Sequence, residues 1–410
     1  MKVLQLNTHA SGGSYEYASL LSAALAEQGI ESHVLCKNQS AEASRPYLDR
    51  VIRRSYVSLS TEPWHGTRRL LCPPAPEDLD GVDVVHLHTV ADWFDVPSWL
   101  EILPKHIGVI VSLHDMWHFT GGCFLYRGCN LYSETCAPCP ILKTPLNRVL
   151  AKDEQRRKLR AYRNRRVQFV ANSQWLADLA ERSPIVRVCG GTRVIPPGID
   201  TTIFRPQDKA ESRANFGIAQ DAFVIAAGAA SLADTNKNIQ WLLQQLAKLS
   251  GLDNVLILLA GEGAIKTPVG LNVRAVGRVP DRAKRSKLFG AADVFVSASL
   301  METYGVTLIE AMSCGTPVVA FRVGGIPEAA PDGQVALLCE PLDGSAFLAA
   351  IERLRSSRQL RDELGRAASN LALPRNNKGQ FAAAFPQIYR ACMKTVRTDV
   401  SNQFWTSQWT

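Results

Sequence analysis

The sequence has no apolar run long enough to cross a membrane as a helix. Its apolar runs, such as Val255–Leu259, have the length of a strand, whereas a membrane-spanning helix needs roughly 20 residues. Met1–Asn7 reads as a strand and lacks the apolar core of a secretion signal. Cysteine is sparse, with 10 in 410 residues, which excludes a disulfide-rich scaffold. We therefore expect a cytoplasmic protein with reduced cysteines.

The chain also lacks the composition of a disordered protein. Hydrophobic residues make up 46% and charged residues 20%, so the chain has enough apolar surface for a packed core. A chain of 410 residues is longer than one ordinary domain. Two domains are therefore expected.

Positive charge is concentrated in one segment, residues 143–166. Ten basic residues lie there against only Asp153 and Glu154, a surplus of +8 that equals the net charge of the whole chain. Such a segment suggests a surface for anionic lipid, nucleic acid or a phosphorylated substrate, with a solvated helix face as the alternative. Nucleic acid is disfavoured because the segment contains a single aromatic residue, Tyr162, for stacking on bases. The basic residues are Lys143, Arg148, Lys152, Arg156, Arg157, Lys158, Arg160, Arg163, Arg165 and Arg166.

Strand-like apolar segments alternate with segments of helical period along the chain. This pattern predicts parallel sheets covered on both faces by helices, and because the series starts twice, it predicts two doubly wound, Rossmann-like domains. The first series is Val3–Leu6, His33–Cys36, Val82–Leu87, Val109–Leu113 and Val167–Ala171. The second series is Phe223–Ala227, Val255–Leu259, Val273–Val276, Asp293–Ser297, Val318–Phe321 and Val335–Leu338.

The break between the two series is Val194–Asp200, where paired prolines and a glycine predict an extended linker. We therefore expect a first domain over 1–193, a linker over 194–206 and a second domain over 207–378. Residues 379–410 are expected to add an amphipathic helix, a candidate to pack back on the first domain, and a polar tail.

The densest motif is Met301–Pro317, which follows an expected strand and opens a helix. The backbone amides of Gly305, Val306 and Thr307 would have no intrahelical partner, and the glycine would let a ligand approach the backbone closely. A helix N-terminus of this kind suits a phosphate or diphosphate group.

Two carboxylates, Glu302 and Glu310, bracket this turn. Both can face the crevice beyond the carboxyl ends of the strands, where open α/β sheets bind ligands. Because carboxylates repel a phosphate, their useful partners are hydroxyl groups, such as those of a sugar and of ribose. The alternative is structural, with Glu302 capping the helix and Glu310 exposed to solvent.

This arrangement resembles the Glu-x7-Glu signature of family 4 of the retaining glycosyltransferases. These have the GT-B fold, in which the active site lies in the cleft between two Rossmann-like domains. The similarity covers nearly the whole chain and rests on an ordered set of motifs. Besides the glutamate pair, the set comprises the Gly12-Gly13 turn, the Val194–Asp200 linker, Lys237 before a helix, Gly261-Glu262-Gly263 after a strand, and Val318–Ala320 leading to Gly324-Gly325.

The resemblance implies that the second domain binds the donor, a nucleoside diphosphate sugar (NDP-sugar). Glu310 would bind the ribose hydroxyls, and Glu302 would bind hydroxyls of the donor sugar. Lys237 and the helix N-terminus at 305–307 would hold the diphosphate.

The resemblance also places groups of the first domain, the acceptor-side domain, at the cleft. Gly13 would approach the phosphates. His114, at the carboxyl end of a strand and oriented by Asp115, would be the active-site histidine near the donor sugar. A buried histidine bonded to the backbone is the alternative for His114.

One feature of the family is missing here. The family has an arginine about five residues before the lysine that corresponds to Lys237, whereas Ala230–Asn236 contains no arginine. Arg278 is a candidate substitute. The missing cation also supports an alternative function, a non-catalytic nucleotide-sugar-binding subunit.

Four of the ten cysteines lie close together, at Cys123, Cys129, Cys136 and Cys139. The Cys-x2-Cys pair that ends this cluster is typical of tetrahedral zinc sites, so a structural zinc site is predicted, with reduced packing cysteines or disulfides as alternatives. A metal there would brace a loop facing the acceptor and would take no part in catalysis. The stretch His114–Cys123 resembles a bacterial subgroup of the family, of exopolysaccharide or colanic-acid type.

The expected function is the transfer of a sugar from an NDP-sugar to a hydroxyl, without a cofactor or catalytic metal. The resemblance implies that the anomeric configuration of the sugar is retained. The acceptor is expected to be a saccharide or lipid-linked precursor of exopolysaccharide or O-antigen. Residues 143–166 would then make peripheral contact with the anionic inner face of the cytoplasmic membrane. A phosphorylase of the same fold is disfavoured because no site for a lysine-linked cofactor is recognisable.

Overall fold

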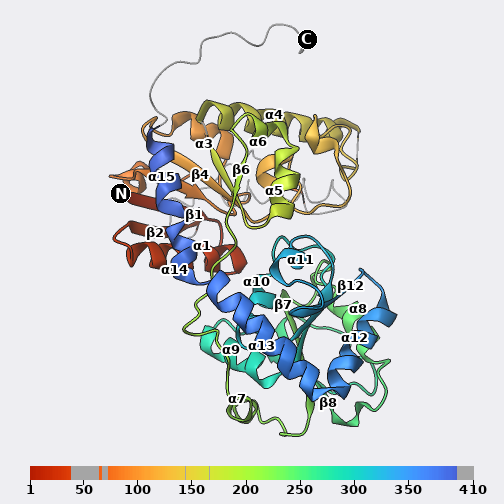
Figure 1. The fold of residues 1–410 in the computed structure, drawn as a ribbon. Coiled ribbons are helices and arrows are strands. Elements are labelled where there is room, and N and C mark those ends of the chain that lie inside the picture. Colours follow the sequence, from red (N-terminus) through yellow and green to blue (C-terminus); the bar gives the residue numbers. More distant parts are fainter. Residues whose placement is uncertain (38–63, 67–72, 144, 166, 395–410) are drawn as a thin grey trace.

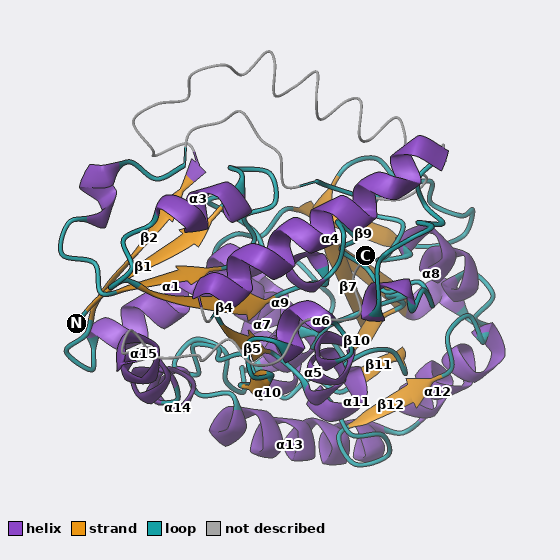
Figure 2. Cartoon of the chain, turned by 90° about the horizontal axis from the view of Figure 1, so that it is seen from above, coloured by secondary structure: helices purple, strands orange, loops and turns teal. Residues whose placement is uncertain are grey.

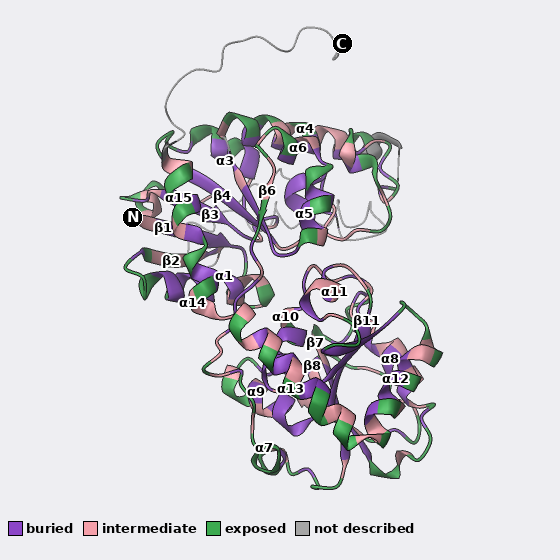
Figure 3. Ribbon diagram, viewed as in Figure 1, coloured by how far each residue is buried: buried purple, intermediate pink, exposed green. Residues whose placement is uncertain are grey.

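The computed structural model describes residues 1–37, 64–66, 73–143, 145–165 and 167–394. The chain forms two lobes, each built on a six-stranded parallel sheet (Figure 1). Buried strands lie between helices whose outer faces are exposed (Figure 3). This is the pair of doubly wound α/β domains that the alternating pattern predicts.

The sheet of the first lobe has its switch point at β1. The chain runs outward from β1 to β2 and then returns past β1 to β3, so a crevice opens beyond the carboxyl ends of β1 and β3. In spatial order the strands are β2 (Glu31–Cys36), β1 (Lys2–Asn7), β3 (Val84–Leu87), β4 (Gly108–Leu113), β5 (Gln168–Ala171) and β6 (Thr192–Val194).

Between β1 and β6, the described residues form five α-helices. In two of them, a side chain that caps the first turn fixes where the helix begins. The Asp95 side chain accepts a hydrogen bond from the Ser98 amide, and Ser173 accepts one from the Leu176 amide. Such caps satisfy amides that the helix itself leaves unpaired. The helices are α1 (Gly13–Ala26), α3 (Val96–Ile102), α4 (Pro145–Arg165), α5 (Gln174–Glu181) and α6 (Pro184–Arg187), with short 3-10 turns η2 (Pro76–Leu79), η3 (Trp117–Phe119) and η4 (Leu131–Ser133).

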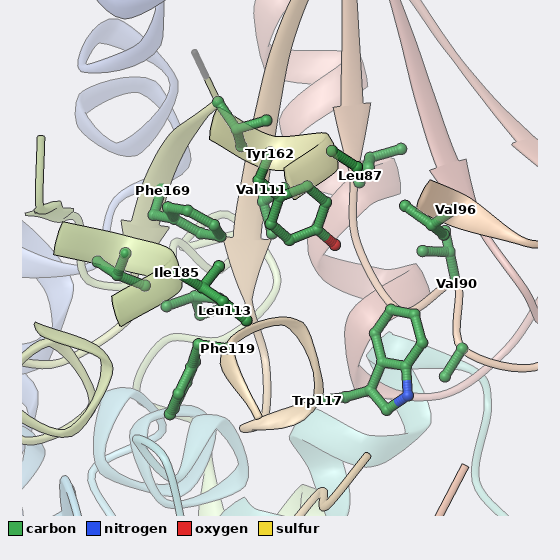
Figure 4. Packing of buried hydrophobic residues seen from close by; sticks show 14 of the residues in the cluster. Leu87, Val90, Val96, Val111, Leu113, Trp117, Phe119, Tyr162, Phe169 and Ile185 are labelled. Carbon is green, nitrogen blue, oxygen red and sulfur yellow. The ribbon is translucent and has the colours of Figure 1, made fainter. Parts of the chain in front are cut away.

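The core of the first lobe lies between the sheet and the helices that follow β3, β4 and β5 (Figure 4). Its side chains are fully or almost fully buried, which accounts for the near-continuous apolar character of these strands. Residues shown in this packing include Leu87, Val90, Val96, Val111, Leu113, Trp117, Phe119, Tyr162, Phe169 and Ile185.

The second lobe repeats the doubly wound arrangement (Figure 2). In spatial order its strands are β12 (Ala336–Cys339), β11 (Val318–Phe321), β10 (Val294–Ser297), β7 (Phe223–Ser231), β8 (Val255–Glu262) and β9 (Val273–Gly277). Its helices are α7 (Lys209–Asn215), α8 (Ile239–Leu246), α9 (Arg282–Ala291), α10 (Val306–Ser313), α11 (Ile326–Ala329), α12 (Gly344–Ser356) and α13 (Arg358–Arg375), with a 3-10 turn η5 (Leu252–Asn254). Its switch point, between β7 and β10, again opens a crevice at the carboxyl ends.

The C-terminal helices return to the first lobe. After α13, helices α14 (Lys378–Ala383) and α15 (Phe385–Lys394) run along that lobe (Figure 1). Phe381, Phe385 and Tyr389 are buried against residues of α1, β3 and β4. Lys378 also forms an ion pair with Glu27, which follows α1, with 2.8 Å between Nζ and Oε1. The second lobe is therefore joined to the first by two stretches of chain.

Strand β6 was not among the strands predicted from the sequence. Its last residue, Val194, is the first residue of the predicted linker. It has three residues, of which Arg193 and Val194 are exposed. An edge strand this short and this exposed has no apolar run by which the sequence could show it.

The basic segment differs from the uniform basic face that its composition suggests. Lys158 of α4 is fully buried, and its Nζ donates to the carbonyl oxygens of Trp117 and Thr120. Arg157 forms an ion pair with Asp95, 2.6 Å between Nη2 and Oδ2. Arg165 donates to three carbonyl groups of the loop that follows α3. These three residues are bound within the first lobe, and the prediction is wrong for them.

Candidate active site

A cleft of about 470 Å³ lies between the two lobes. The first lobe contributes the turn after β1 and the start of α1, and the second lobe contributes the ends of β7, β8 and β9 with the start of α10. The cleft thus lies at the carboxyl ends of both sheets, where doubly wound folds bind ligands. Of the predicted site residues, Gly13, Val306, Thr307 and Glu310 line it, as does Arg278.

Gly12 and Gly13 form the first-lobe wall of the cleft. Gly12 has φ of +91°, a conformation that favours glycine. A Cβ atom at either position would meet no other atom within 4 Å. Packing within the chain therefore does not require Gly13 to lack a side chain, and the space beside it is open to a ligand.

The opposite wall begins at α10. Gly305 precedes the helix with φ of +90°, and the helix starts at Val306. The first amides of a helix have no intrahelical acceptor, so those of Val306 and Thr307 can bind an anion in the cleft. Gly305 itself does not line the cleft.

Glu310 is buried and is held by an arginine that the sequence analysis missed. Arg285 of α9 donates to Glu310 Oε1 at 2.8 Å and to Glu16 Oε2 of α1 at 2.6 Å. Burial raises the pKa of Glu310 to about 7, and the charge of Arg285 acts in the opposite direction. The predicted exposure of Glu310 to solvent, offered as the structural alternative, does not occur.

Three arginines line the second-lobe side of the cleft near its junction with α1. They are Arg278, which follows β9, and Arg282 and Arg285 of α9. The cleft thus has arginines from β9 onward, whereas Ala230–Asn236 supplies none, and the substitution by Arg278 stays a prediction. In the sequence, Arg282 and Arg285 were visible only as basic residues at the start of an expected helix. The helical period did not show which face of that helix lines the cleft.

Lys237 and Glu302 lie together, and neither lines the cleft. Their side chains form an ion pair between Nζ and Oε1. Asn236 brings the two segments together, because its Nδ2 donates to the Met301 carbonyl at 2.9 Å and its carbonyl accepts from the Leu300 amide at 2.8 Å. The pair therefore forms one unit beside the cleft.

The Gly324-Gly325 pair supports the Glu302 loop. A Cβ atom at Gly324 would lie 1.8 Å from the carbonyl oxygen of Glu302, and the Gly325 amide donates to that same oxygen at 3.0 Å. These glycines allow the chain after β11 to pack against the backbone at Glu302 and Thr303.

His114 follows β4 and joins the two lobes through its backbone. Its carbonyl oxygen accepts from Thr303 Oγ1 at 3.4 Å, and its ring contacts that of Tyr17, which lines the cleft, at 4.8 Å between centroids. Its Nε2 lies 2.9 Å from Nδ1 of His88. Burial lowers the pKa of His114 to about 4, so the ring is neutral at pH 7.

Asp115 does not bond to the His114 ring, contrary to the prediction. Its Oδ1 accepts from the Trp117 amide at 2.8 Å, which fixes the turn into η3. The side chain that contacts the His114 ring nitrogen Nε2 is His88, which follows β3 as the second histidine of the His86-Leu87-His88 sequence.

The four clustered cysteines line one small cavity, together with apolar residues of the same loop. Burial raises the pKa of Cys136 to about 12, and the nearby thiols act in the same direction. Cys123, Cys129 and Cys136 are not in disulfides. Across the described ranges, no group of three or more His, Cys, Asp and Glu side chains is arranged to hold a metal ion. The zinc site stays a prediction from spacing.

Two family models match the chain. Residues 11–203 match the description "Glycosyltransferase Family 4", and residues 223–357 match "Glycosyl transferases group 1". The first match includes Gly13 and His114, and the second includes Lys237, Glu302 and Glu310.

Curated relatives are similar over part of their length. The chain is 32% identical over 198 residues to D-inositol 3-phosphate glycosyltransferase of Arthrobacter sp. (strain FB24), covering 43% of this chain and 44% of that one. It is also 32% identical over 223 residues to the same enzyme of Saccharomonospora viridis, covering 50% and 51%. The chain thus spans about half the length of the curated relatives it matches.

Solved structures share the fold over nearly the whole chain. Sucrose-phosphate synthase from Thermosynechococcus elongatus has a TM-score of 0.68 at 19% identity, with 96% of this chain and 99% of that one covered. HepE of Anabaena, in complex with UDP-glucose, has a TM-score of 0.62 at 16% identity, with 95% and 100% covered. The two parallel six-stranded sheets are the GT-B architecture of these glycosyltransferases.

Within the described residues, no helix has the length and apolar character needed to span a bilayer.

Proposed function

We propose that this chain is a retaining glycosyltransferase that transfers a sugar from an NDP-sugar to a hydroxyl group. The observation that carries the proposal is the cleft itself. A helix N-terminus, a buried carboxylate and an open glycine turn meet there from two Rossmann-like lobes. The matched glycosyltransferase regions and the inositol-phosphate glycosyltransferase relatives support the same activity.

Each cleft group has a role in this proposal. Glu310, held in place by Arg285, accepts hydrogen bonds from the ribose hydroxyls. The amides of Val306 and Thr307 and the arginines of the cleft bind the diphosphate, and Gly13 leaves room for it. Glu302 binds hydroxyls of the donor sugar, and Lys237 binds the diphosphate. Because neither lines the cleft as it stands, their ion pair must separate when the donor binds.

The transfer itself needs a stabilised leaving group. As the bond between the sugar and the diphosphate breaks, negative charge develops on the diphosphate, which the α10 N-terminus and the cleft arginines stabilise. In a front-face reaction that same diphosphate accepts the proton of the incoming hydroxyl, so no carboxylate nucleophile is required. We propose that catalysis proceeds in this way without a metal or a cofactor, with His114 at the donor sugar.

We further propose a lipid-linked or polysaccharide acceptor, as in exopolysaccharide assembly at the inner face of the cytoplasmic membrane. The support is α4, on the outer face of the first lobe (Figure 1). Arg156, Arg160 and Arg163 are exposed there and are spaced along one face of the helix. Three arginines on one face can hold a protein against anionic lipid.

A thermal-shift panel of UDP-, GDP-, ADP- and dTDP-sugars tests the function. A ligand at about 100 times its Kd adds roughly 2.7 kcal/mol to the free energy of unfolding. A raised melting temperature with one nucleotide class, followed by release of that nucleotide when acceptor saccharides are added, supports the proposed glycosyltransferase activity. A shift without any turnover supports the alternative of a non-catalytic binding subunit, and no shift at all contradicts both.

A further inference from the structure

A series of three buried or part-buried hydrogen bonds leads from Ser32 of the edge strand β2 to His114. His114 Nε2 lies 2.9 Å from His88 Nδ1, and His88 Nε2 lies 2.9 Å from Gln5 Oε1. Gln5 Nε2 in turn donates to Ser32 Oγ at 2.9 Å. Gln5 and His88 are fully buried. No function assigned above uses either residue.

The donor and acceptor atoms along this series of hydrogen bonds determine which ring nitrogens carry a hydrogen. An amide oxygen only accepts hydrogen bonds, so His88 Nε2 must carry a hydrogen to bond to Gln5 Oε1. A neutral imidazole has one N–H, so His88 Nδ1 is an acceptor, and His114 Nε2 must carry the hydrogen of the bond between the two rings. Both rings are neutral, because burial lowers the pKa of His88 well below its usual value and that of His114 to about 4.

We infer that Gln5 and His88 are positioning residues that hold His114 as the Nε2–H tautomer, so that its Nδ1 accepts a hydrogen bond from a hydroxyl group of the bound sugar. Among the described residues, no group donates to His114 Nδ1. His114 as a residue is half-buried and does not line the cleft, but its ring packs against Tyr17, which does.

This assignment limits what can bind beside His114. A hydroxyl group can donate to Nδ1, whereas a carboxylate would place an acceptor against an acceptor. The sugar class that fits is therefore one that presents a hydroxyl at this point. This statement about the sugar rests on the proposed function, but the tautomer of His114 does not.

The reverse order of protons requires the Gln5 amide to be turned over. Its Nε2 would then donate to His88 Nε2, His88 Nδ1–H would donate to His114 Nε2, and His114 would carry its hydrogen on Nδ1. Ser32 fits either order because a hydroxyl both donates and accepts. The two orders predict opposite tautomers for both histidines, so one measurement separates them.

Nitrogen-15 NMR of the histidine rings in the full, ligand-free chain at pH 7 is that measurement. We expect His88 and His114 to carry hydrogen on Nε2 alone. Hydrogen on Nδ1 of His114 overturns the inference, whatever the enzyme activity. Gln5→Met removes the acceptor and is expected to give a mixture of His114 tautomers, whereas Gln5→Glu keeps an acceptor oxygen and is expected to retain Nε2–H.

Tyr389→Phe is the matched control for loss of a buried hydrogen bond. Tyr389 OH lies 3.0 Å from His86 Nδ1. This hydrogen bond is in the same cluster of rings but is not part of the series of hydrogen bonds from Ser32 to His114. The control should leave the His114 tautomer unchanged while lowering the melting temperature about as much as Gln5→Met does. A changed His114 signal in this variant would mean that the tautomer follows general packing, which contradicts the inference.

The role in turnover is tested with UDP-glucose, or with the panel sugar that raises the melting temperature most. Gln5→Met should lower kcat roughly tenfold with little change in KM, a loss comparable to one misplaced hydrogen bond, and Gln5→Glu should restore most of it. An unchanged kcat in Gln5→Met with a mixed tautomer overturns the positioning role. If the natural chain turns over no sugar while the NMR result holds, the proposed function fails and the tautomer assignment stands.

Discussion

Arg285 of the second lobe and Glu16 of the first are joined across the cleft, with 2.6 Å between Nη2 and Oε2. The same Nη2 atom lies 2.8 Å from Glu310 Oε1. One guanidinium thus holds the two lobes together beside the proposed nucleotide site and also compensates a buried carboxylate. The proposed ribose-binding carboxylate Glu310 and the contact between the lobes therefore share one guanidinium group.

Arg285→Met should be strongly destabilising, because it leaves Glu310 buried without its counter-charge. We expect a loss of roughly 3 kcal/mol in the free energy of unfolding by urea, typical of breaking a buried ion pair. Glu16→Gln removes only the more exposed partner and should cost under about 1 kcal/mol. Equal losses in the two variants would show that Arg285 does not compensate Glu310.

Glu310→Gln and His114→Ala should affect different kinetic constants. Glu310→Gln is expected to raise the Kd of the accepted NDP-sugar roughly tenfold to a hundredfold, the range for a hydrogen bond to a charged group. His114→Ala should mainly lower kcat. Titration calorimetry and steady-state kinetics measure both effects, with Glu340→Gln, an exposed carboxylate on the second lobe, as control. The reverse pattern would mean that the two roles are exchanged.

Changing Arg156, Arg160 and Arg163 together to Ser should weaken binding to anionic liposomes. Each arginine near such a surface contributes about 1 kcal/mol, so the loss approaches roughly a hundredfold at low salt. The matched control is the triple change of Arg353, Arg358 and Arg366 to Ser, which removes the same charge from exposed sites on the second lobe. Equal effects of the two triple variants would leave α4 an ordinary solvated helix.

Acid should destabilise the chain through its buried histidines. Burial lowers the pKa of His86 and His118 to about 3 and that of His114 to about 4, and it lowers the pKa of His88 well below its usual value. The unfolded chain then binds more protons than the folded chain below pH 6.5, so stability falls as pH falls. At pH 5 each of the four groups costs about 2 kcal/mol.

Two carboxyl groups offset part of that loss. Burial raises the pKa of Asp115 to about 6 and that of Glu310 to about 7, so the folded state takes up protons there first. Urea unfolding at pH 7 and pH 5 should still show a net loss, because four histidines outweigh two carboxyls. A free energy of unfolding that stays constant or rises toward pH 5 would contradict the neutral histidine cluster.

The sequence by itself determined the two doubly wound lobes and the helix that starts at Val306. Alternating apolar strands and helical periods are local signals, and burial on both faces of a parallel sheet leaves a continuous apolar run that needs no tertiary information. Gly305 is equally local, because its positive φ is a property of the turn itself.

Only the tertiary structure decided which distant side chains meet. Arg285 reaches Glu16 across 269 positions of sequence, and His88 reaches His114 across 26. Lys158 is buried although its segment has the highest positive charge in the chain, because it faces the carbonyl groups of η3 and the turn after it. A charge pattern records how many ionisable groups a segment carries, whereas the packing of the lobes sets the partner and the solvent exposure of each one.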